Sequence, residues 1–219
     1  QTCALPILRY AVTYPLEFRN IQSCYPIFFS KSSETGEFFP IALMGFEDGE
    51  NLFLSDSGWD AAYIPMMMER QPFLIGYQAS SDDQQDKKPV VSIDMDSPKL
   101  SEDEGQPLFD ENDLPTDFLK SMMAKLEALY QGHEHNKGFI SALTEIGLLE
   151  PFTLEITLDN GSNNQLLGFY TINEQKLLEL DGETLAGLNS KGYLQPIYMA
   201  VASYARIRAL IDKKNASLL

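Results

Sequence analysis

Apolar and polar positions alternate most strictly at residues 152–158, where Phe, Leu, Ile and Leu are separated by Thr, Glu and Thr. Because the side chains of a strand point alternately to its two faces, this pattern predicts a strand with one buried and one wet face. An Asp-Asn-Gly sequence at 159–161 is a strong turn signal. Residues 165–172 are therefore expected to return as the partner strand of a β-hairpin.

The N-terminal part of the chain is rich in aromatic and branched residues. Residues 25–30 and 38–46 are predicted to be two strands of a hairpin. The segment 38–46 is apolar at both alternating sets of positions, which predicts a central strand covered on both faces. Two further strands are expected at 73–77 and 89–94, with the polar tract 79–88 as a flexible surface loop between them.

Helical spacing dominates the second half of the chain. Residues 118–133 carry apolar side chains at i, i+4, i+8 and i+11, and a second helix at 139–146 ends before a glycine. Asn173 and Asp181 can each cap a short helix, and 194–214 is expected to form the last one. The sequence thus predicts an α+β fold with an antiparallel, meander-like N-terminal sheet, then a helix pair, a β-hairpin and C-terminal helices.

A chain of 219 residues can form one large domain or two small ones. We expect a single domain over 8–219, composed of a β-rich half (8–95), an acidic link (96–117) and an α+β half (118–219). We expect the link to be an ordered segment between the two halves that packs against the rest of the fold. We interpret residues 1–7 as the scar of a sequencing adapter, because codons for them can spell a common adapter sequence, and such scars are excluded from fold reasoning.

The negative charge of the protein is concentrated in the middle of the chain. Residues 82–117 contain 12 Asp or Glu against 3 Lys, and so carry −9 of the formal net charge of −16. Nucleic acids and anionic membranes bind clustered Lys and Arg, so this charge argues against both as partners. No apolar run approaches the roughly 20 residues of a membrane-spanning helix. We expect a soluble protein whose partner is an unknown protein or small-molecule ligand.

Two histidines are candidate metal ligands. His133 and His135 flank Glu134, and a His-x-His pair on a strand or loop can bind a metal with a carboxylate as a further ligand. The interpretation that we prefer is a solvent-exposed junction between the two helices. Hydrolase chemistry would need an imidazole beside a nucleophile, and Cys24 precedes an apolar strand, where a small packed side chain is typical. We therefore assign no metal and no cofactor.

Four other residues are candidates for ligand binding. Asp94 and Asp96 begin like a calcium loop, but the Ser-Pro that follows breaks the required spacing. Trp59 opens a segment compatible with a short helix over 59–70, and with the nearby methionines it could line a groove for a peptide or small molecule. Filling of the core is the simpler interpretation. As a binding site, Trp59, Tyr63, Asp94 and Asp96 would have to converge on one concave pocket.

Nine short motifs carry a family resemblance. They are Tyr25-Pro-Ile-Phe-Phe, Phe39-Pro-Ile-Ala-Leu-Met-Gly-Phe, Gly49-Glu-Asn-Leu-Phe, Trp59-Asp-Ala-Ala-Tyr-Ile-Pro, Arg70-Gln-Pro-Phe, Ile93-Asp-Met-Asp-Ser-Pro, Glu104-Gly-Gln-Pro-Leu-Phe, Pro151-Phe-Thr-Leu-Glu-Ile-Thr-Leu and Gly168-Phe-Tyr-Thr-Ile-Asn-Glu. Each motif alone is weak, but nine in this order are specific. From about Tyr10 to Ile211 the chain resembles the bacterial SapC family.

The resemblance implies a bacterial protein loosely associated with the paracrystalline surface layer, for which the family is named. The peptide-transporter permease of the same name is a different, membrane-spanning protein. The family supplies no catalytic residue, so we expect a non-enzymatic binding or accessory protein, with surface-layer or envelope association implied by the resemblance. The alternative is a metal-dependent or carboxylate-using enzyme of unknown substrate. If Cys3 belongs to the adapter scar, Cys24 is the only natural cysteine and forms no intramolecular disulfide, which favours the cytoplasm as the location of the protein.

Overall fold

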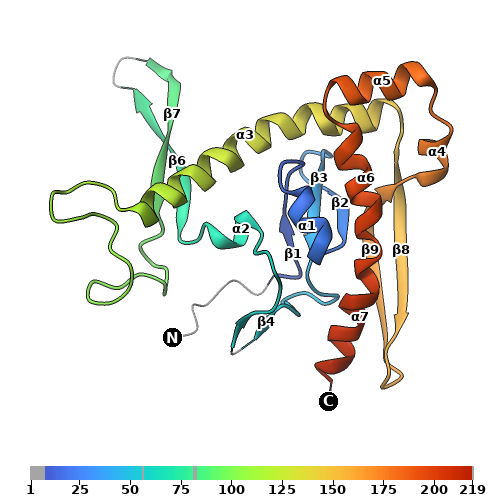
Figure 1. The fold of residues 1–219 in the computed structure, drawn as a ribbon, viewed down its shortest axis with the longest axis horizontal. Coiled ribbons are helices and arrows are strands. Elements are labelled where there is room, and N and C mark those ends of the chain that lie inside the picture. The colour runs from blue at the N-terminus through green and yellow to red at the C-terminus, as the bar shows by residue number, and fades with distance from the viewer. Residues whose placement is uncertain (1–7, 56, 81–82, 219) are drawn as a thin grey trace. The chain divides into compact units, whose positions relative to one another are not determined.

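A computed structural model of the chain describes residues 8–55, 57–80 and 83–218 (Figure 1). Helices and antiparallel strands are both present, which confirms the α+β class. The segment 1–7, which the sequence led us to interpret as an adapter scar, lies outside the described residues.

The described chain divides into two compact units. One comprises residues 66–131 and is called the ribbon unit, after its two-stranded β-ribbon. The other comprises the described residues of 7–65 and 132–219 and is called the sheet unit, after its main β-sheet. The expectation of a single domain over 8–219 stays a prediction.

The sheet unit is built on an antiparallel sheet. Among the residues that the structure describes, five strands form it in the order β1-β3-β2-β9-β8. Their bounds are Tyr10–Val12 (β1), Ile27–Lys31 (β2), Phe38–Leu43 (β3), Leu149–Thr157 (β8) and Asn163–Ile172 (β9). A separate short pair consists of Leu54–Ser55 (β4) and Gly58–Trp59 (β5).

The strand β3 is internal to the sheet, with a neighbouring strand on each side, as its apolar sequence predicts. Ile41 of β3 pairs with Val12 of β1 on one side and with Phe28 of β2 on the other. Ile41 and Ala42, whose side chains point to opposite faces of the strand, are both fully buried. Continuous apolar character thus marks a strand that is covered on both faces.

The C-terminal hairpin belongs to the same sheet as the N-terminal strands. Its strands β8 and β9 pair with each other as the alternating sequence predicts. β9 also pairs with β2, where Phe29 lies opposite Tyr170. The sequence pattern does not indicate this pairing, because alternation specifies a strand's faces and leaves its neighbour open.

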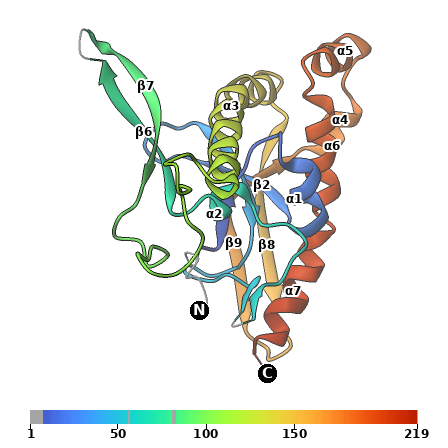
Figure 2. The ribbon, with the colours of Figure 1, turned by 60° about the vertical axis from the view of Figure 1, so that its left-hand side comes forward.

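Helices pack on the sheet and on one another. Those of the sheet unit are Phe18–Cys24 (α1), Glu174–Leu178 (α4), Gly182–Ser190 (α5), Leu194–Ser203 (α6) and Arg206–Ala216 (α7). Figures 1 and 2 show α6 running along the sheet beside β9. Asn173 and Asp181 cap α4 and α5 by accepting hydrogen bonds from the backbone, as predicted.

The prediction of one continuous last helix over 194–214 is wrong. The helix is interrupted between α6 and α7 at Tyr204 and Ala205. Tertiary contacts of Tyr204 accompany this break. Its ring stacks on Phe28 at 5.6 Å between ring centroids, and its hydroxyl accepts a hydrogen bond from the Ile172 N–H at 2.9 Å.

The predicted helix pair is a single helix, α3 (Asp117–Glu145), of 29 residues. It begins in the ribbon unit and ends in the sheet unit. No break occurs at the expected junction, because glycine is tolerated in a helix when packing offsets its cost. A Cβ on Gly132 would lie 2.3 Å from the Leu16 side chain, and one on Gly138 would lie 2.5 Å from the Tyr193 hydroxyl. These glycines therefore serve close packing instead of ending a helix.

The ribbon unit pairs β6 (Phe73–Ser80) with β7 (Asp83–Ile93) and includes the short helix α2 (Met66–Glu69). A small core joins Phe73 of the ribbon to Leu119, Met122 and Leu126 of α3, which confirms the amphipathic spacing of this helix. The prediction of a loop over 79–88 is wrong for the described backbone, which continues both strands. Ladder hydrogen bonds are made by the backbone and so do not require apolar side chains.

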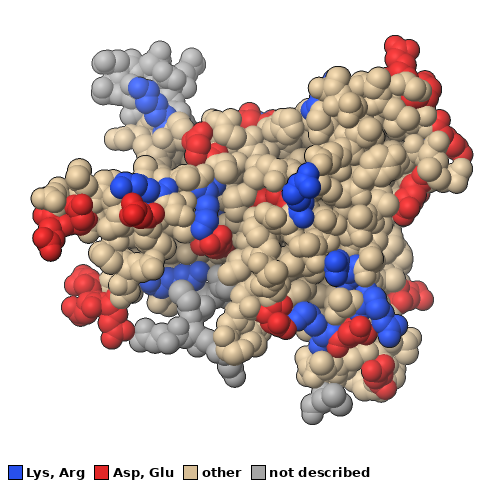
Figure 3. Space-filling view, in the orientation of Figure 1, with Lys and Arg blue, Asp and Glu red and all other residues tan. Residues whose placement is uncertain are grey.

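The acidic link, 96–117, is largely irregular. Its acidic side chains gather over the loops at the left of Figure 3. Asp110 organises one turn, accepting from the N–H groups of Leu114 and Asn112, which hold the pKa of its carboxyl below the ordinary value. Leu108 packs against the ribbon-unit core, whereas Phe109 and Leu114 are exposed. Of these three apolar side chains, Leu108 is the one that packs against a core.

Candidate functional site

The sequence candidates Trp59 and Tyr63 belong to a hydrogen-bonded network in the sheet unit. The Trp59 indole donates to the Tyr25 hydroxyl at 2.7 Å, and that hydroxyl donates to the Tyr63 carbonyl. The Tyr63 hydroxyl in turn donates to Glu17 Oε1 at 2.8 Å. Burial raises the pKa of Tyr25 above its ordinary value, even though the Trp59 hydrogen bond acts in the opposite direction. Tyr25 therefore stays neutral and can donate.

Glu17 is the residue of this network that sequence analysis did not single out. Its side chain is buried, with 1% of the residue exposed. Besides Tyr63, Thr13 donates a hydrogen bond to its second carboxylate oxygen at 3.2 Å. No feature of the sequence distinguishes Glu17 from the exposed carboxylates, because its burial arises from tertiary packing. The network fixes the segment containing Trp59 onto the start of α1, which indicates a structural role.

The other two sequence candidates, Asp94 and Asp96, lie in the ribbon unit. They occupy a turn after β7, in which Asp94 Oδ1 accepts a hydrogen bond from the Asp96 N–H at 3.1 Å. Both residues are exposed. Trp59 and Tyr63 are in the sheet unit, so the convergence of all four side chains on one pocket stays a prediction.

The two histidines do not lie at a helix junction, because α3 is continuous through them. His133 is beside Tyr14, with 3.5 Å between Nδ1 and the hydroxyl, whereas the ring of His135 contacts that of Tyr193. Residues two apart on a helix point in different directions, which explains the separate neighbours. Among the described residues, no group of three His, Cys, Asp or Glu side chains is placed to hold a metal ion.

An open groove of about 910 Å³ lies within the sheet unit. One wall is the β2–β3 hairpin from Lys31 to Phe39, and the other is the C-terminal half of α3. Val12, Phe38 and Ile140 contribute apolar lining. Pockets that bury small ligands or short peptide segments have this range of size and this mixture of apolar and polar lining.

Asn136 is the most informative residue of the groove. It lies on α3, lines the groove and is only 7% exposed. Its side-chain oxygen is buried and accepts no hydrogen bond from the residues that the structure describes. A buried polar atom without a partner is costly and calls for an explanation. A ligand in the groove that donates a hydrogen bond would supply one.

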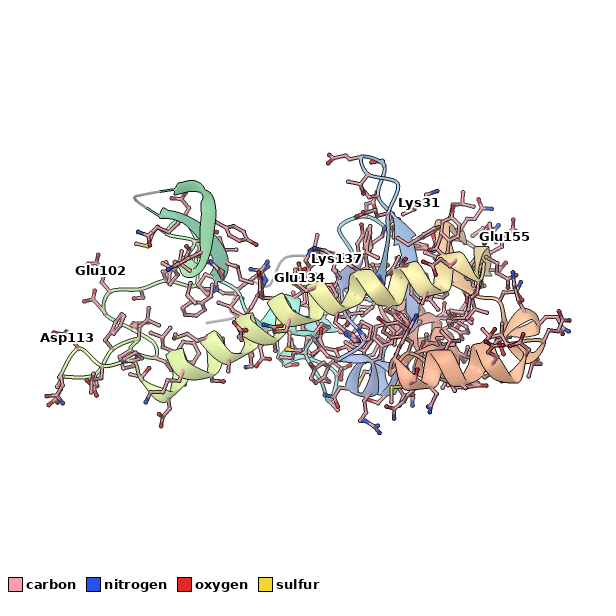
Figure 4. All side chains as sticks on the ribbon, turned by 90° about the horizontal axis from the view of Figure 1, so that it is seen from above. Lys31, Glu102, Asp113, Glu134, Lys137 and Glu155 are labelled. Carbon is pink, nitrogen blue, oxygen red and sulfur yellow. The ribbon has the colours of Figure 1, made fainter. Side chains whose placement is uncertain are left out.

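Charged side chains surround the groove on both walls. Lys31 lies over the ring of Phe38, with 5.2 Å from Nζ to the ring centroid, and Lys137 forms an ion pair with Glu134 at 2.7 Å. Figure 4 places Lys31 on the hairpin and Lys137 on α3. The hydrogen bond from Lys137 is the main cause of the lowered pKa of Glu134. Glu145 accepts from a serine hydroxyl on the same helix, so both signs of charge are present.

Sequence analysis missed the groove, although one signal for it existed. Asn136 occupies the apolar stripe of α3, seven residues after Leu129 and four before Ile140. A polar residue in such a stripe is either exposed by a local change of packing or buried for a purpose. The hairpin wall carries no comparable signal, because its approach to α3 is a tertiary feature.

The fold and the groove define an α+β protein with a concave site of ligand size. A family model described as SapC matches residues 8–210, and the chain belongs to the SapC family. This match confirms the family expected from the nine motifs. No curated protein and no solved structure matches the chain. Among the described residues, no helix has both the length and the apolar character needed to cross a membrane.

Proposed function

We propose that this protein is a non-enzymatic binding or accessory protein whose ligand occupies the groove between the β2–β3 hairpin and α3. The observation that carries the proposal is Asn136, a buried amide oxygen without a described partner in a groove of about 910 Å³. A ligand donor at this oxygen would recover the hydrogen bond that the fold alone leaves unmade, worth about 1–3 kcal/mol.

The surroundings of Asn136 support binding more than catalysis. The charged groups nearby are engaged with each other, as in the Lys137–Glu134 ion pair and the Ser141–Glu145 hydrogen bond. Such pairs position a ligand by charge and shape.

Association with the surface layer or envelope is a further part of the proposal. Its support is membership of the SapC family, for which this association is implied by the family's name. Cell fractionation of the host checks it: the protein is expected to sediment in part with the envelope. Release of the whole pool with the cytoplasmic fraction would remove this part of the proposal and leave the groove unaffected.

The groove is tested by NMR with isotope-labelled protein and fractions of host extract. A groove ligand is expected to shift the side-chain amide signal of Asn136 saturably and to lose affinity in Asn136→Leu. Asn189→Leu is the matched control, because Asn189 is an exposed helical asparagine in α5. Saturable shifts confined to other surfaces, or turnover of a component of the extract, would contradict the proposal.

A further inference from the structure

The edge of β3 that faces away from β2 is only partly covered. β2 pairs with β3 as far as Phe38, which lies opposite Lys31. On the other side β1 pairs only with residues 41–43, after which the Thr13 N–H donates to the Pro40 carbonyl at 3.1 Å. The chain then turns toward α1. Phe38 therefore lies on a strand edge that no described strand covers.

The backbone of Phe38 points its hydrogen-bonding groups toward this open edge. The Glu37 carbonyl accepts from the Ser32 N–H at 2.9 Å, on the β2 side, whereas the Pro40 carbonyl faces β1. Successive residues of a strand direct their N–H and C=O groups to opposite sides. The backbone N–H and C=O of Phe38 therefore point to the same side of β3 as the Pro40 carbonyl, which is the side of β1. Val12 of β1 also lines the groove.

We propose that the groove binds an extended peptide segment, which pairs with the backbone of Phe38 and donates a hydrogen bond to Asn136. The inference rests on the proposed function and names the class of ligand. An exposed strand edge is a template for addition of another strand, and peptide recognition by this route is common. The peptide would occupy the position that β1 leaves when the chain turns away.

The lining of the groove fits such a segment. A peptide in strand conformation offers a donor and an acceptor at alternate residues, which matches the N–H and C=O of Phe38. Its side chains on one face would rest on Val12 and Ile140. Lys31 and Lys137 are balanced by Glu37 and Glu145 along the lining, so a peptide without a large net charge suits the groove.

The first test uses the whole protein and short random peptides displayed on phage. Selection on the wild-type protein is expected to enrich peptides with alternating apolar residues, and these should bind Asn136→Leu at least about tenfold more weakly than Asn189→Leu. Failure to enrich any peptide above background would overturn the inference, as would equal binding to both variants.

The second test distinguishes strand addition from other peptide binding. N-methylation of single residues in an enriched peptide is expected to weaken binding by about tenfold at the one residue whose N–H pairs with the Phe38 carbonyl, and to leave binding unchanged at the residues next to it, because the N–H groups of those neighbours face away from β3. Equal tolerance at all positions would overturn the strand geometry. Only the peptide is modified in this test, so misfolding of a protein variant cannot explain a change in binding.

A third test changes the protein partner of the backbone hydrogen bonds between the peptide and Phe38. Phe38→Pro removes the edge N–H, and proline is accepted at strand edges whose N–H faces outward. Phe38→Leu is the control that keeps the N–H while removing the ring. The proline variant should bind an enriched peptide about tenfold more weakly than the leucine variant.

If another ligand shifts the Asn136 amide signal while peptides do not bind, the inference fails and the proposed function stands. If nothing shifts Asn136, both fail.

Discussion

The Tyr63 hydroxyl is a hydrogen-bond partner of a buried carboxyl group. It donates to Glu17, whose residue is 1% exposed, and removing one partner of a buried carboxylate leaves desolvation uncompensated. We expect Tyr63→Phe to lower the free energy of unfolding by about 1–3 kcal/mol, measured by urea denaturation. Tyr198→Phe, at an exposed tyrosine of α6, is the control and should change stability little. Equal effects of the two variants would contradict a supporting role for the Tyr63 hydroxyl.

Because of Lys214, we expect the stability of the sheet unit to depend on pH in alkaline solution. Its side chain is 8% exposed and forms ion pairs with Glu47 and Glu50. Burial lowers the pKa of the ammonium, but hydrogen bonds and charge from the two glutamates outweigh burial and raise it above the ordinary value of 10.5. The stabilisation is therefore complete below about pH 10.5 and is lost as pH rises through the higher pKa of the folded state.

Lys214→Met checks this dependence. At neutral pH the free energy of unfolding of the variant should be lower than that of the wild type by about 1–3 kcal/mol. This loss is smaller than that expected for a fully buried ion pair, because the Glu47 side chain is largely exposed. The difference from the wild type, measured by urea denaturation at increasing pH, should shrink above about pH 10.5. A difference that stays constant to the highest pH at which the protein folds would contradict the raised pKa.

At the same scale, the sequence could predict only part of the candidate site. Trp59 and Tyr63 were chosen for their residue types, and the structure places them in a partly buried network with Tyr25. Glu17 and Asn136 were missed, because their burial depends on segments far away in the sequence. Residue type indicates what a side chain can do, whereas tertiary packing decides whether it is buried with a partner.

Among the elements, α3 departs most from its sequence pattern. Glycine in a helix normally lowers stability by about 1 kcal/mol relative to alanine, and Gly132 and Gly138 both lie near the junction expected from the sequence. The structure keeps the helix intact because Gly132 and Gly138 admit the Leu16 and Tyr193 side chains. Helix breaks are thus difficult to predict wherever glycine has a packing role that compensates for its poor propensity.

Gly132→Ala tests this role of glycine. A Cβ at this position would lie 2.3 Å from Leu16 and 3.1 Å from Tyr14, so we expect no gain in stability, or a loss of about 1–2 kcal/mol. Gly187→Ala, in α5, has no atom within 4 Å of the added Cβ and should gain about 0.5–1 kcal/mol. Thermal unfolding of both variants gives the comparison. An equal gain for the two variants would contradict the packing explanation.

Local sequence pattern and contacts between distant segments also differ in what they determine about the strands. Alternation predicted the hairpin β8–β9, and continuous apolar character predicted the central position of β3. The pairing of β9 with β2 was not predictable, since strand partners are chosen by packing between distant segments. The strand-edge opening at Phe38 follows from β1 being shorter than β3, a difference that no residue pattern marks.

At the scale of the whole molecule, the two units differ in their cores. The ribbon unit has a small buried cluster of Phe73, Leu119, Met122 and Leu126, whereas in the sheet unit most residues of the strands β2 and β3 are buried. Stability is distributed over cooperative regions, and regions with fewer buried contacts open at lower free energy. We therefore expect amides of β6 and β7 to exchange with solvent faster than those of β2 and β3.

Hydrogen exchange of Leu126→Ala decides whether the units unfold separately. Removing a core leucine costs about 2–5 kcal/mol, and Leu126 lies in the ribbon-unit cluster. If the units are cooperative by themselves, the variant should exchange faster in β6, β7 and the first half of α3, while β2, β3 and β9 keep their protection. Equal loss of protection in both units would instead support the single domain expected from the sequence. Because α3 continues from one unit into the other, the residue along α3 at which protection changes would locate the boundary between the cooperative regions.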